Sequence, residues 1–286
     1  MKQKEFSVVL TSDLSKVFSE IAWHQPWFAS VAVVGQEILA ERDWRAALNS
    51  QALSRSISNH RGLPLHFIAQ EGLPDGVAYE THISACAGVP TRDNLHDFFN
   101  ALVWLRFPQI KRQLNALQAA QIAQSGIGKS RGSARDAATI FDENAALLVL
   151  EKSQRGEQLF ADLKAHRWQQ ALYENAHLYG SAAQVWCFGH ALMEKLVRPY
   201  KAITAHTWVV WVDPTFFTLP IESQTQKIDS KVAEQLRLHP ISTRDYSHLP
   251  VLGIPTWWPK QDAEFYADTQ VFRPPSVRPK PGSTAA

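Results

Sequence analysis

The sequence predicts an α+β fold: one domain of helices packed on short antiparallel hairpins, with an irregular C-terminal region rich in proline and aromatic residues. Three observations indicate this class. Several segments repeat apolar residues at helical spacing, two others alternate around a turn signal, and prolines recur after about residue 218. We expect residues 1–272 to form the single domain and residues 273–286 a disordered tail rich in Pro and Arg.

Composition and charge narrow the class of protein. The 286-residue chain is 45% hydrophobic with a net charge of +2, so it can bury a large core and lacks a strong field for nucleic acid or an anionic membrane. Cys86 and Cys187 form no metal-ligand spacing, and the N-terminus lacks the apolar stretch of a secretion signal. No run approaches the ~20 apolar residues that span a bilayer. The composition predicts a soluble cytoplasmic protein and argues against a membrane or nucleic acid as its partner.

The first third of the chain predicts helices followed by a hairpin. Residues 12–60 are rich in helix formers and begin with a Ser or Asp cap. Two alternating runs, 65–70 and 77–85, then flank a Pro-Asp-Gly turn, which is typical of a β-hairpin. Residues 91–107 predict an amphipathic helix that Pro108 ends, and residues 109–123 predict a second helix.

The stretch "AQSGIGKSRGS", residues 123–133, matches two catalytic signatures. Its Gly-Lys-Ser fits a permissive phosphate-binding P-loop, and Gly128 to Gly132 fits the G-x-S-x-G of a serine hydrolase. Both motifs require a buried strand before the loop and a helix after it. Here an amphipathic helix precedes the stretch and no helical signal follows, so we expect a basic Gly/Ser loop without either activity.

The second half of the chain mixes both element types. Residues 138–150 predict a second hairpin with Asp-Glu-Asn at its turn, and residues 157–174 and 183–198 predict helices, the latter broken at Pro199. Residues 202–213 predict a strand with His206, Trp208, Val210 and Val212 on one face. The region after 218 holds too many prolines for central strands.

The helix at 91–107 carries the first candidate site. His96 and Asn100 are four residues apart and share one face, with Asp97 beside them and Arg92 one turn earlier. The functional interpretation makes His96 a general base or metal ligand that Asp97 or Asn100 orients. The alternative is a structural network that fixes the helix against the hairpin, because buried polar groups need partners in either case.

Two further clusters are candidates. Arg135 could pair with a phosphate or carboxylate, and Asp136, Asp142 and Glu143 could bind a divalent cation through oxygen. Asp142–Asn144 also suit an ordinary hairpin turn, which is the better explanation for those three residues. His190 and Glu194 are one helical turn apart and could hold a divalent metal with His206 as the third ligand. An ordinary weak ion pair on a helix surface is the commoner reason for the His190 and Glu194 spacing.

Several segments together resemble a known family. "VPTRDNLHDFFNALVWLRFPQIKRQLN", "RDAATIFDENAALLVLE", "FGHALMEKLVRPYKAITAH", "VLGIPTWWP" and "FYADTQVFRP" are similar to the bacterial family named domain of unknown function 3025. The resemblance extends over about residues 23–274. It implies a bacterial, single-domain protein and carries over no activity.

Two functional hypotheses follow from these residues. The first is a hydrolase-like enzyme with His96, Asp97 and Asn100 as its acid–base centre and with Arg92, Arg135 and Asp136 holding a small-molecule or anionic substrate. The second is a non-catalytic module that binds a protein or nucleic-acid partner through the basic loop 129–135 and the tail.

Overall fold

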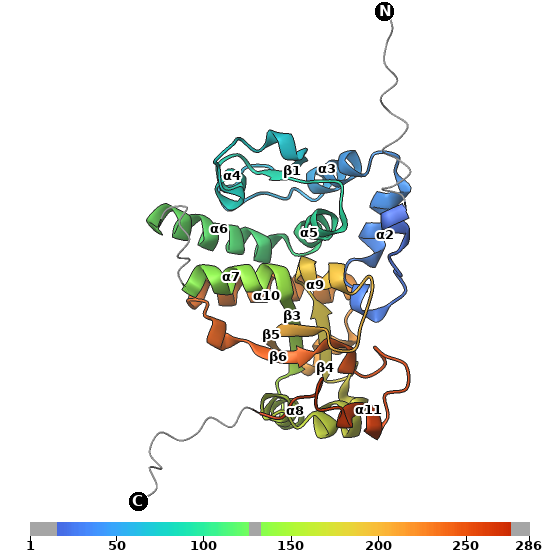
Figure 1. Ribbon diagram of the computed structural model, residues 1–286. Coiled ribbons are helices and arrows are strands. Elements are labelled where there is room, and N and C mark those ends of the chain that lie inside the picture. Colours follow the sequence, from blue (N-terminus) through green and yellow to red (C-terminus); the bar gives the residue numbers. More distant parts are fainter. Residues whose placement is uncertain (1–15, 126–132, 276–286) are drawn as a thin grey trace, which may run out of the picture.

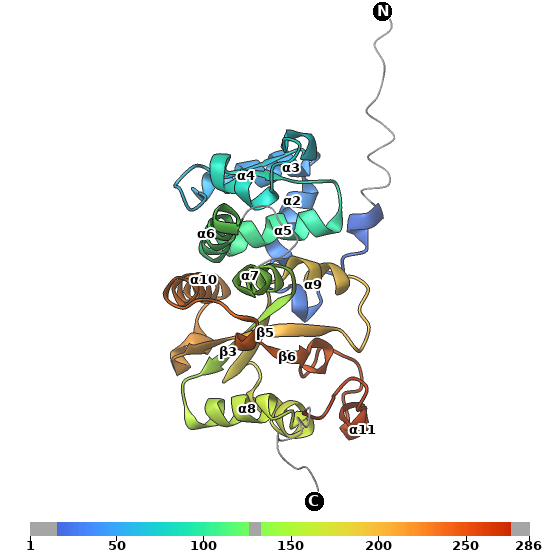
Figure 2. The ribbon, with the colours of Figure 1, turned by 60° about the vertical axis from the view of Figure 1, so that its left-hand side comes forward.

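The computed structural model describes residues 16–125 and 133–275. A four-stranded sheet lies in the lower half of the molecule, and helices cover both of its faces (Figures 1 and 2). Further helical layers stack above the upper face, ending in a small two-stranded sheet. The predicted class, helices and strands mixed within one domain, is confirmed.

The larger sheet has the strand order β4-β3-β5-β6. Its centre is a parallel pair, β3 (Ala145–Glu151) and β5 (Thr204–Val212). β4 (Ala183–Cys187) pairs antiparallel with β3, and β6 (Ser247–Pro250) pairs antiparallel with β5. All residues of β3 are buried, as expected for a central strand with helices on both faces. The sheet is therefore mixed, and its two outer strands are edges.

Different helices cover the two faces of this sheet. The face that supports the candidate site carries α7 (Ser133–Asn144), α9 (His190–Lys195) and α10 (Ile221–Leu238) (Figure 2). The opposite face carries α8 (Gln154–Lys164), a π-helical turn (Gln169–Glu174) and α11 (Ala263–Ala267). Above α7, α9 and α10 lie α5 (Leu95–Arg106) and α6 (Pro108–Ser125), which confirm the two helices predicted at 91–107 and 109–123.

The outermost layer contains the small sheet, in which β1 (His66–Ile68) pairs in parallel with β2 (Gly88–Pro90). The hairpin predicted at 65–85 is therefore wrong. Most of its expected second strand forms α4 (Tyr79–Cys86), because Tyr79 and Ile83, four residues apart, share the helix face that packs inward. α2 (Ala32–Ala40) and α3 (Trp44–Ser54) complete the layer and confirm helices within residues 12–60.

The hairpin predicted at 138–150 is also wrong, although its second strand is β3. Residues 138–144 form the last turns of α7, in which Ala137, Ala138 and Phe141 are buried at helical spacing. The helix predicted at 183–198 divides into β4 and α9. The predicted strand at 202–213 is confirmed as β5.

The C-terminal third is more regular than its prolines suggest. α10 occupies residues expected to be irregular, and its buried side chains Ile228, Val232 and Leu236 recur every four residues. Short 3-10 turns make up much of the remaining connections: Pro26–Phe28 (η1), Gln70–Gly72 (η2), Ala176–Leu178 (η4), Pro214–Thr218 (η5), Thr243–Asp245 (η6) and Val251–Gly253 (η7).

Some predictions fall outside the described part of the chain. Residues 126–132, which hold most of the P-loop-like and G-x-S-x-G patterns, lie there, as does 276–286 of the predicted tail. The flanking segments are α6 and α7, so a helix does follow this stretch of sequence where none was expected. Within residues 16–125 and 133–275, no helix combines the length and apolar character needed to cross a membrane.

Candidate active site

Helices from three layers bring polar side chains together above the large sheet. α5 supplies His96 and Asn100, α7 supplies Asp142, and α9 supplies His190; all four line one polar cavity of about 200 Å³. Tyr79 of α4 forms another part of its wall. The layered packing thus places residues from distant parts of the sequence around one small space.

His96 lies at the centre of a chain of titratable groups. Its Nδ1 is 2.9 Å from Oε2 of Glu194, and its Nε2 is 3.0 Å from Nε2 of His190. The two imidazole rings meet edge to face, with centroids 4.4 Å apart. His96 is partly exposed, whereas His190 is buried. The pair therefore connects the protein surface at Glu194 with the interior of the cavity.

A second hydrogen-bonded chain starts at Asp142. The buried Lys111 Nζ donates to Asp142 Oδ1 at 2.5 Å and to Asn100 Oδ1 at 2.8 Å. Asn100 Nδ2 donates in turn to the Tyr79 hydroxyl at 2.9 Å. The other oxygen of Asp142, Oδ2, lies 3.9 Å from His190 Nδ1. Asp142 is thus the point where the two chains approach each other.

The charge states of these groups follow from their surroundings. Burial lowers the pKa of His190 to about 4, with Lys111 adding to the effect, so this ring is neutral near pH 7. Burial alone raises the pKa of Asp142, but Lys111 and His190 more than offset it, and the net pKa lies below the usual range. Burial raises the pKa of Tyr79, so its phenol keeps its proton. Asp142 and Lys111 therefore form a buried ion pair.

The hydrogen bonds also define the protons on the two histidines. A carboxylate only accepts, so His96 Nδ1 carries the proton that it donates to Glu194. When His96 is neutral, its Nε2 has the lone pair that can accept Nε2–H of His190, and His190 Nδ1 has no hydrogen-bond partner among the described residues. The contact gives a proton a path between His190 and His96.

Asp97 and Asn100 do not orient His96, and that part of the sequence prediction is wrong. Asp97 Oδ2 accepts from the backbone N–H and from Nε of Arg92 at 2.7 and 2.9 Å, and Oδ1 accepts from Nη2 at 3.0 Å. Asn100 bonds Lys111 and Tyr79 instead. Arg92, which precedes α5, and Asp97, in the first turn of α5, line the cavity as an ion pair, which leaves the guanidinium less free for a substrate.

The structure does not assemble the predicted metal ligands into one set. His190 and Glu194 each contact His96, whereas His206 Nδ1 lies 2.9 Å from Asn144 Nδ2, with its ring 4.9 Å from that of His248. Across the described residues, no group of three or more His, Cys, Asp or Glu side chains is arranged to hold a metal ion.

The second predicted cluster lies on α7. Arg135 and Asp136 are half-buried in the first turns of this helix and lie outside the set of residues that lines the cavity. Arg135 is close enough to Glu80 of the cavity wall to lower the pKa of that carboxyl, which burial raises overall. Lys129 and Arg131 of the predicted basic loop fall outside the described residues, so the binding-module hypothesis stays a prediction.

Sequence reasoning missed Lys111 and Tyr79 as members of this site, and it assigned Asp142 to a cation site or a turn rather than to a pair with Lys111. Lys111 falls within a predicted helix, where a lysine is ordinarily solvated. Tyr79 falls on a predicted strand that forms α4 instead. The sequence does carry one signal for the site, the i, i+4 pair His190 and Glu194. The two side chains contact His96 rather than a shared metal, His190 through its imidazole and Glu194 through its carboxylate.

Comparison with protein families gives a match to a model described as Protein of unknown function (DUF3025), over residues 65–276. The chain belongs to the DUF3025 family. The match begins later than the resemblance over 23–274 suggested, but its range includes every residue of the polar cavity. Searches of curated proteins and of solved structures each found no match.

Proposed function

We propose that this DUF3025 protein is a hydrolase-like acid–base enzyme whose proton relay is Glu194–His96–His190. The observation that carries the proposal is the 3.0 Å contact between the Nε2 atoms of His96 and His190 at the wall of a polar cavity. Two imidazoles in direct contact accept a proton at one end and present it at the other.

The relay explains how a buried histidine can act as a base. In the proposed relay His190 Nδ1, which is enclosed and has no partner among the described residues, takes a proton from a water or hydroxyl that also contacts Asp142 Oδ2, 3.9 Å away. Its Nε2 proton moves to His96 Nε2, so the added charge rests next to Glu194 rather than in the interior. Reversal of these transfers delivers a proton to the leaving group.

The charges around the cavity favour a small polar substrate that is neutral or cationic, in place of the anionic substrate expected from the sequence. Asp97 and Asp142 are each paired with a cation, Arg92 and Lys111 respectively. Glu143 also lines the cavity, and its carboxylate opposes an anion, whereas burial raises the pKa of Glu80 and so disfavours its charged form.

A panel of chromogenic substrates tests this function. We would assay p-nitrophenyl acetate as the neutral ester, alanine p-nitroanilide as the cationic amide and p-nitrophenyl phosphate as the anion. We expect turnover of a neutral or cationic substrate, with His96→Asn and Glu194→Gln each losing roughly 100-fold or more in kcat, the scale of general acid–base catalysis. Melting temperatures should stay within a few degrees, because both side chains are partly exposed.

The exposed His24, which does not line the cavity, supplies the matched control. His24→Asn should leave the activity unchanged. Turnover that survives in His96→Asn and Glu194→Gln, or that is confined to the phosphate ester, would contradict the proposal.

A further inference from the structure

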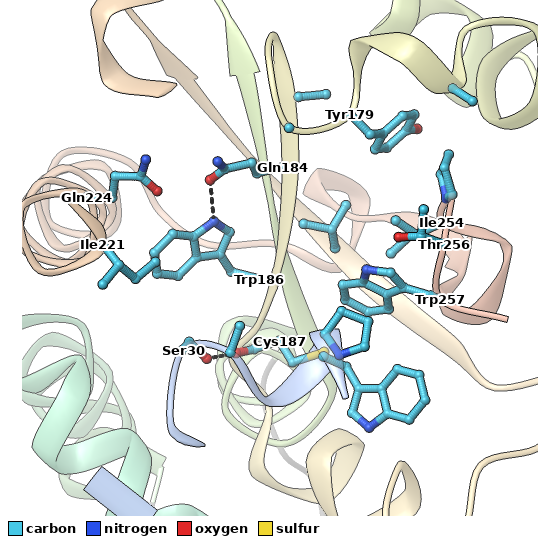
Figure 3. Close-up of a pocket in the computed structure, with 18 residues that line it drawn as sticks. Ser30, Tyr179, Gln184, Trp186, Cys187, Ile221, Gln224, Ile254, Thr256 and Trp257 are labelled. Carbon is cyan, nitrogen blue, oxygen red and sulfur yellow. Dashed lines mark hydrogen bonds between the residues drawn. The ribbon is translucent and has the colours of Figure 1, made fainter. Parts of the chain in front are cut away.

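A second cavity of about 340 Å³ lies along the outer edge of strand β4, at a different place from the polar cavity (Figure 3). Every residue of β4 contributes to its lining, and β4 is the last strand on its side of the sheet. The cavity thus follows the backbone edge of a strand that has a neighbour on one side only.

The register of β4 shows which of its backbone groups face this cavity. Glu151 N–H donates to Ala182 O, and Phe188 N–H donates to Ala145 O, so residues at even positions exchange hydrogen bonds with β3. The residues at odd positions, Ala183, Val185 and Cys187, therefore direct their N–H and C=O groups away from β3, toward the open edge.

Two of the three outward carbonyls already accept hydrogen bonds. Gly180 N–H donates to Ala183 O at 2.7 Å, and the Ser30 hydroxyl donates to Cys187 O at 3.4 Å (Figure 3). These contacts close the two ends of the edge. Val185 lies between them, and no described residue donates to its C=O or accepts from its N–H.

Uncharged side chains form a wall on each side of this edge. On one side the Trp186 indole is held by its Nε1–H, which donates to Gln184 Oε1 at 3.0 Å, with Ile221 of α10 nearby (Figure 3). On the other side stand Ile254 and Trp257 (Figure 3). No Asp, Glu, Lys, Arg or His is among the described residues that line the cavity.

We propose that this groove binds an extended, uncharged peptide segment of another protein, which adds to the sheet as a strand beside β4. The backbone of such a segment would exchange hydrogen bonds with Val185 N–H and C=O. Side chains of a strand point alternately to opposite faces, so successive residues would meet the Trp186 wall and the Trp257 wall. Aromatic or aliphatic residues would suit both walls.

The groove favours a single strand over a second copy of this chain. The edge of β4 is recessed between the two walls, and the β4 edge of another copy would carry its own pair of walls. A strand of five residues spans about 17 Å, which limits the bound segment to a few residues.

The test begins with a displayed library of random heptapeptides selected on the full chain. We expect uncharged peptides with aromatic or aliphatic residues to be enriched. A synthetic copy of the best binder is then methylated on one backbone nitrogen at a time. The peptide methylated at one central position should bind at least tenfold more weakly, because methylation removes the N–H that pairs with Val185 C=O.

Variants of the protein supply the reciprocal measurement. Val185→Pro removes only an outward N–H and leaves the bonds to β3 intact, which an edge strand tolerates. It should weaken binding at least tenfold, whereas Val185→Thr, which keeps the N–H, should bind normally. The N-methyl series leaves the protein unaltered, so it decides the question even if Val185→Pro unfolds. The proposal is overturned if no peptide is enriched, if N-methylation has no effect at any position, or if β4 pairs with a second copy in solution.

Discussion

The Nε2 atoms of His96 and His190 lie 3.0 Å apart, although 94 positions separate the two residues in the sequence. The contact depends on α5 crossing α9, and it is flanked by Glu194 at one end and by Asp142 at the other. Each histidine alone resembles an ordinary core or surface residue. Their juxtaposition is what makes a proton relay feasible.

The buried His190 should make stability depend on pH. Its pKa is about 4 in the folded protein and near 6.5 in an unfolded chain, so the unfolded state binds the proton more readily. The resulting stabilisation is complete above pH 6.5 and is lost as pH falls through 4. A shift of this size corresponds to roughly 3 kcal/mol.

Urea unfolding of wild type and His190→Gln between pH 3.5 and 7.5 measures this effect. The difference between the two free energies of unfolding should shrink as pH falls. Asp229 has a pKa of about 6, raised by burial, and its stabilisation changes in the opposite direction, but it is present in both proteins and cancels. A constant difference across this range would show that His190 is not buried in its neutral form.

The ion pair of Lys111 and Asp142 should be costly to break from one side. Both residues are buried, and Lys111→Met leaves Asp142 without its cation, which is expected to cost about 3–5 kcal/mol. The double variant Lys111→Met/Asp142→Asn removes both charges and should be more stable than Lys111→Met alone. Denaturant unfolding of the two single variants and the double variant gives the coupling free energy between Lys111 and Asp142. Strictly additive losses of unfolding free energy would show that the two residues are not coupled.

Gly189 should tolerate no side chain, because it lies directly against the end of α7. A Cβ at this position would stand 2.5 Å from backbone atoms of Glu143 and Asn144. Gly189→Ala must displace the start of α9 and is expected to cost about 1–3 kcal/mol. Gly180→Ala is a useful comparison, since its Cβ would meet nothing within 4 Å and only its positive φ opposes the change. NMR of the His190 ring should report the displacement, and an unchanged spectrum would refute it.

Asp229 should link α10 to α6. Its carboxylate accepts the backbone N–H groups of Gln109 and Ile110 at 3.0 and 2.9 Å, at the start of α6. Loss of a helix cap costs about 1–2 kcal/mol, so Asp229→Ala should lower the free energy of unfolding by this amount. Asp229→Asn retains an oxygen acceptor and should lose less. Equal losses of unfolding free energy in the two variants would show that the negative charge of Asp229, rather than its hydrogen bonds to the start of α6, stabilises the protein.

The sequence alone predicted those elements whose pattern has a single interpretation. α5 and α6 follow from apolar spacing and Pro108, and β5 follows from its run of β-branched and aromatic residues. The alternation at 77–85 had two interpretations, since residues four apart match both a strand face and a helix face. α10 was missed although Ile228, Val232 and Leu236 signalled it, because the prolines on either side dominated the interpretation.

The sequence determined that His96 and Asn100 share a helix face and need partners, and that His190 and Glu194 share another. Only the tertiary structure decided that these two faces meet, and that Asp97 turns to Arg92 while Glu194 takes the place beside His96. Helix periodicity is local and can be read along the chain. Which faces contact each other depends on how whole layers pack, and that is a property of the complete core.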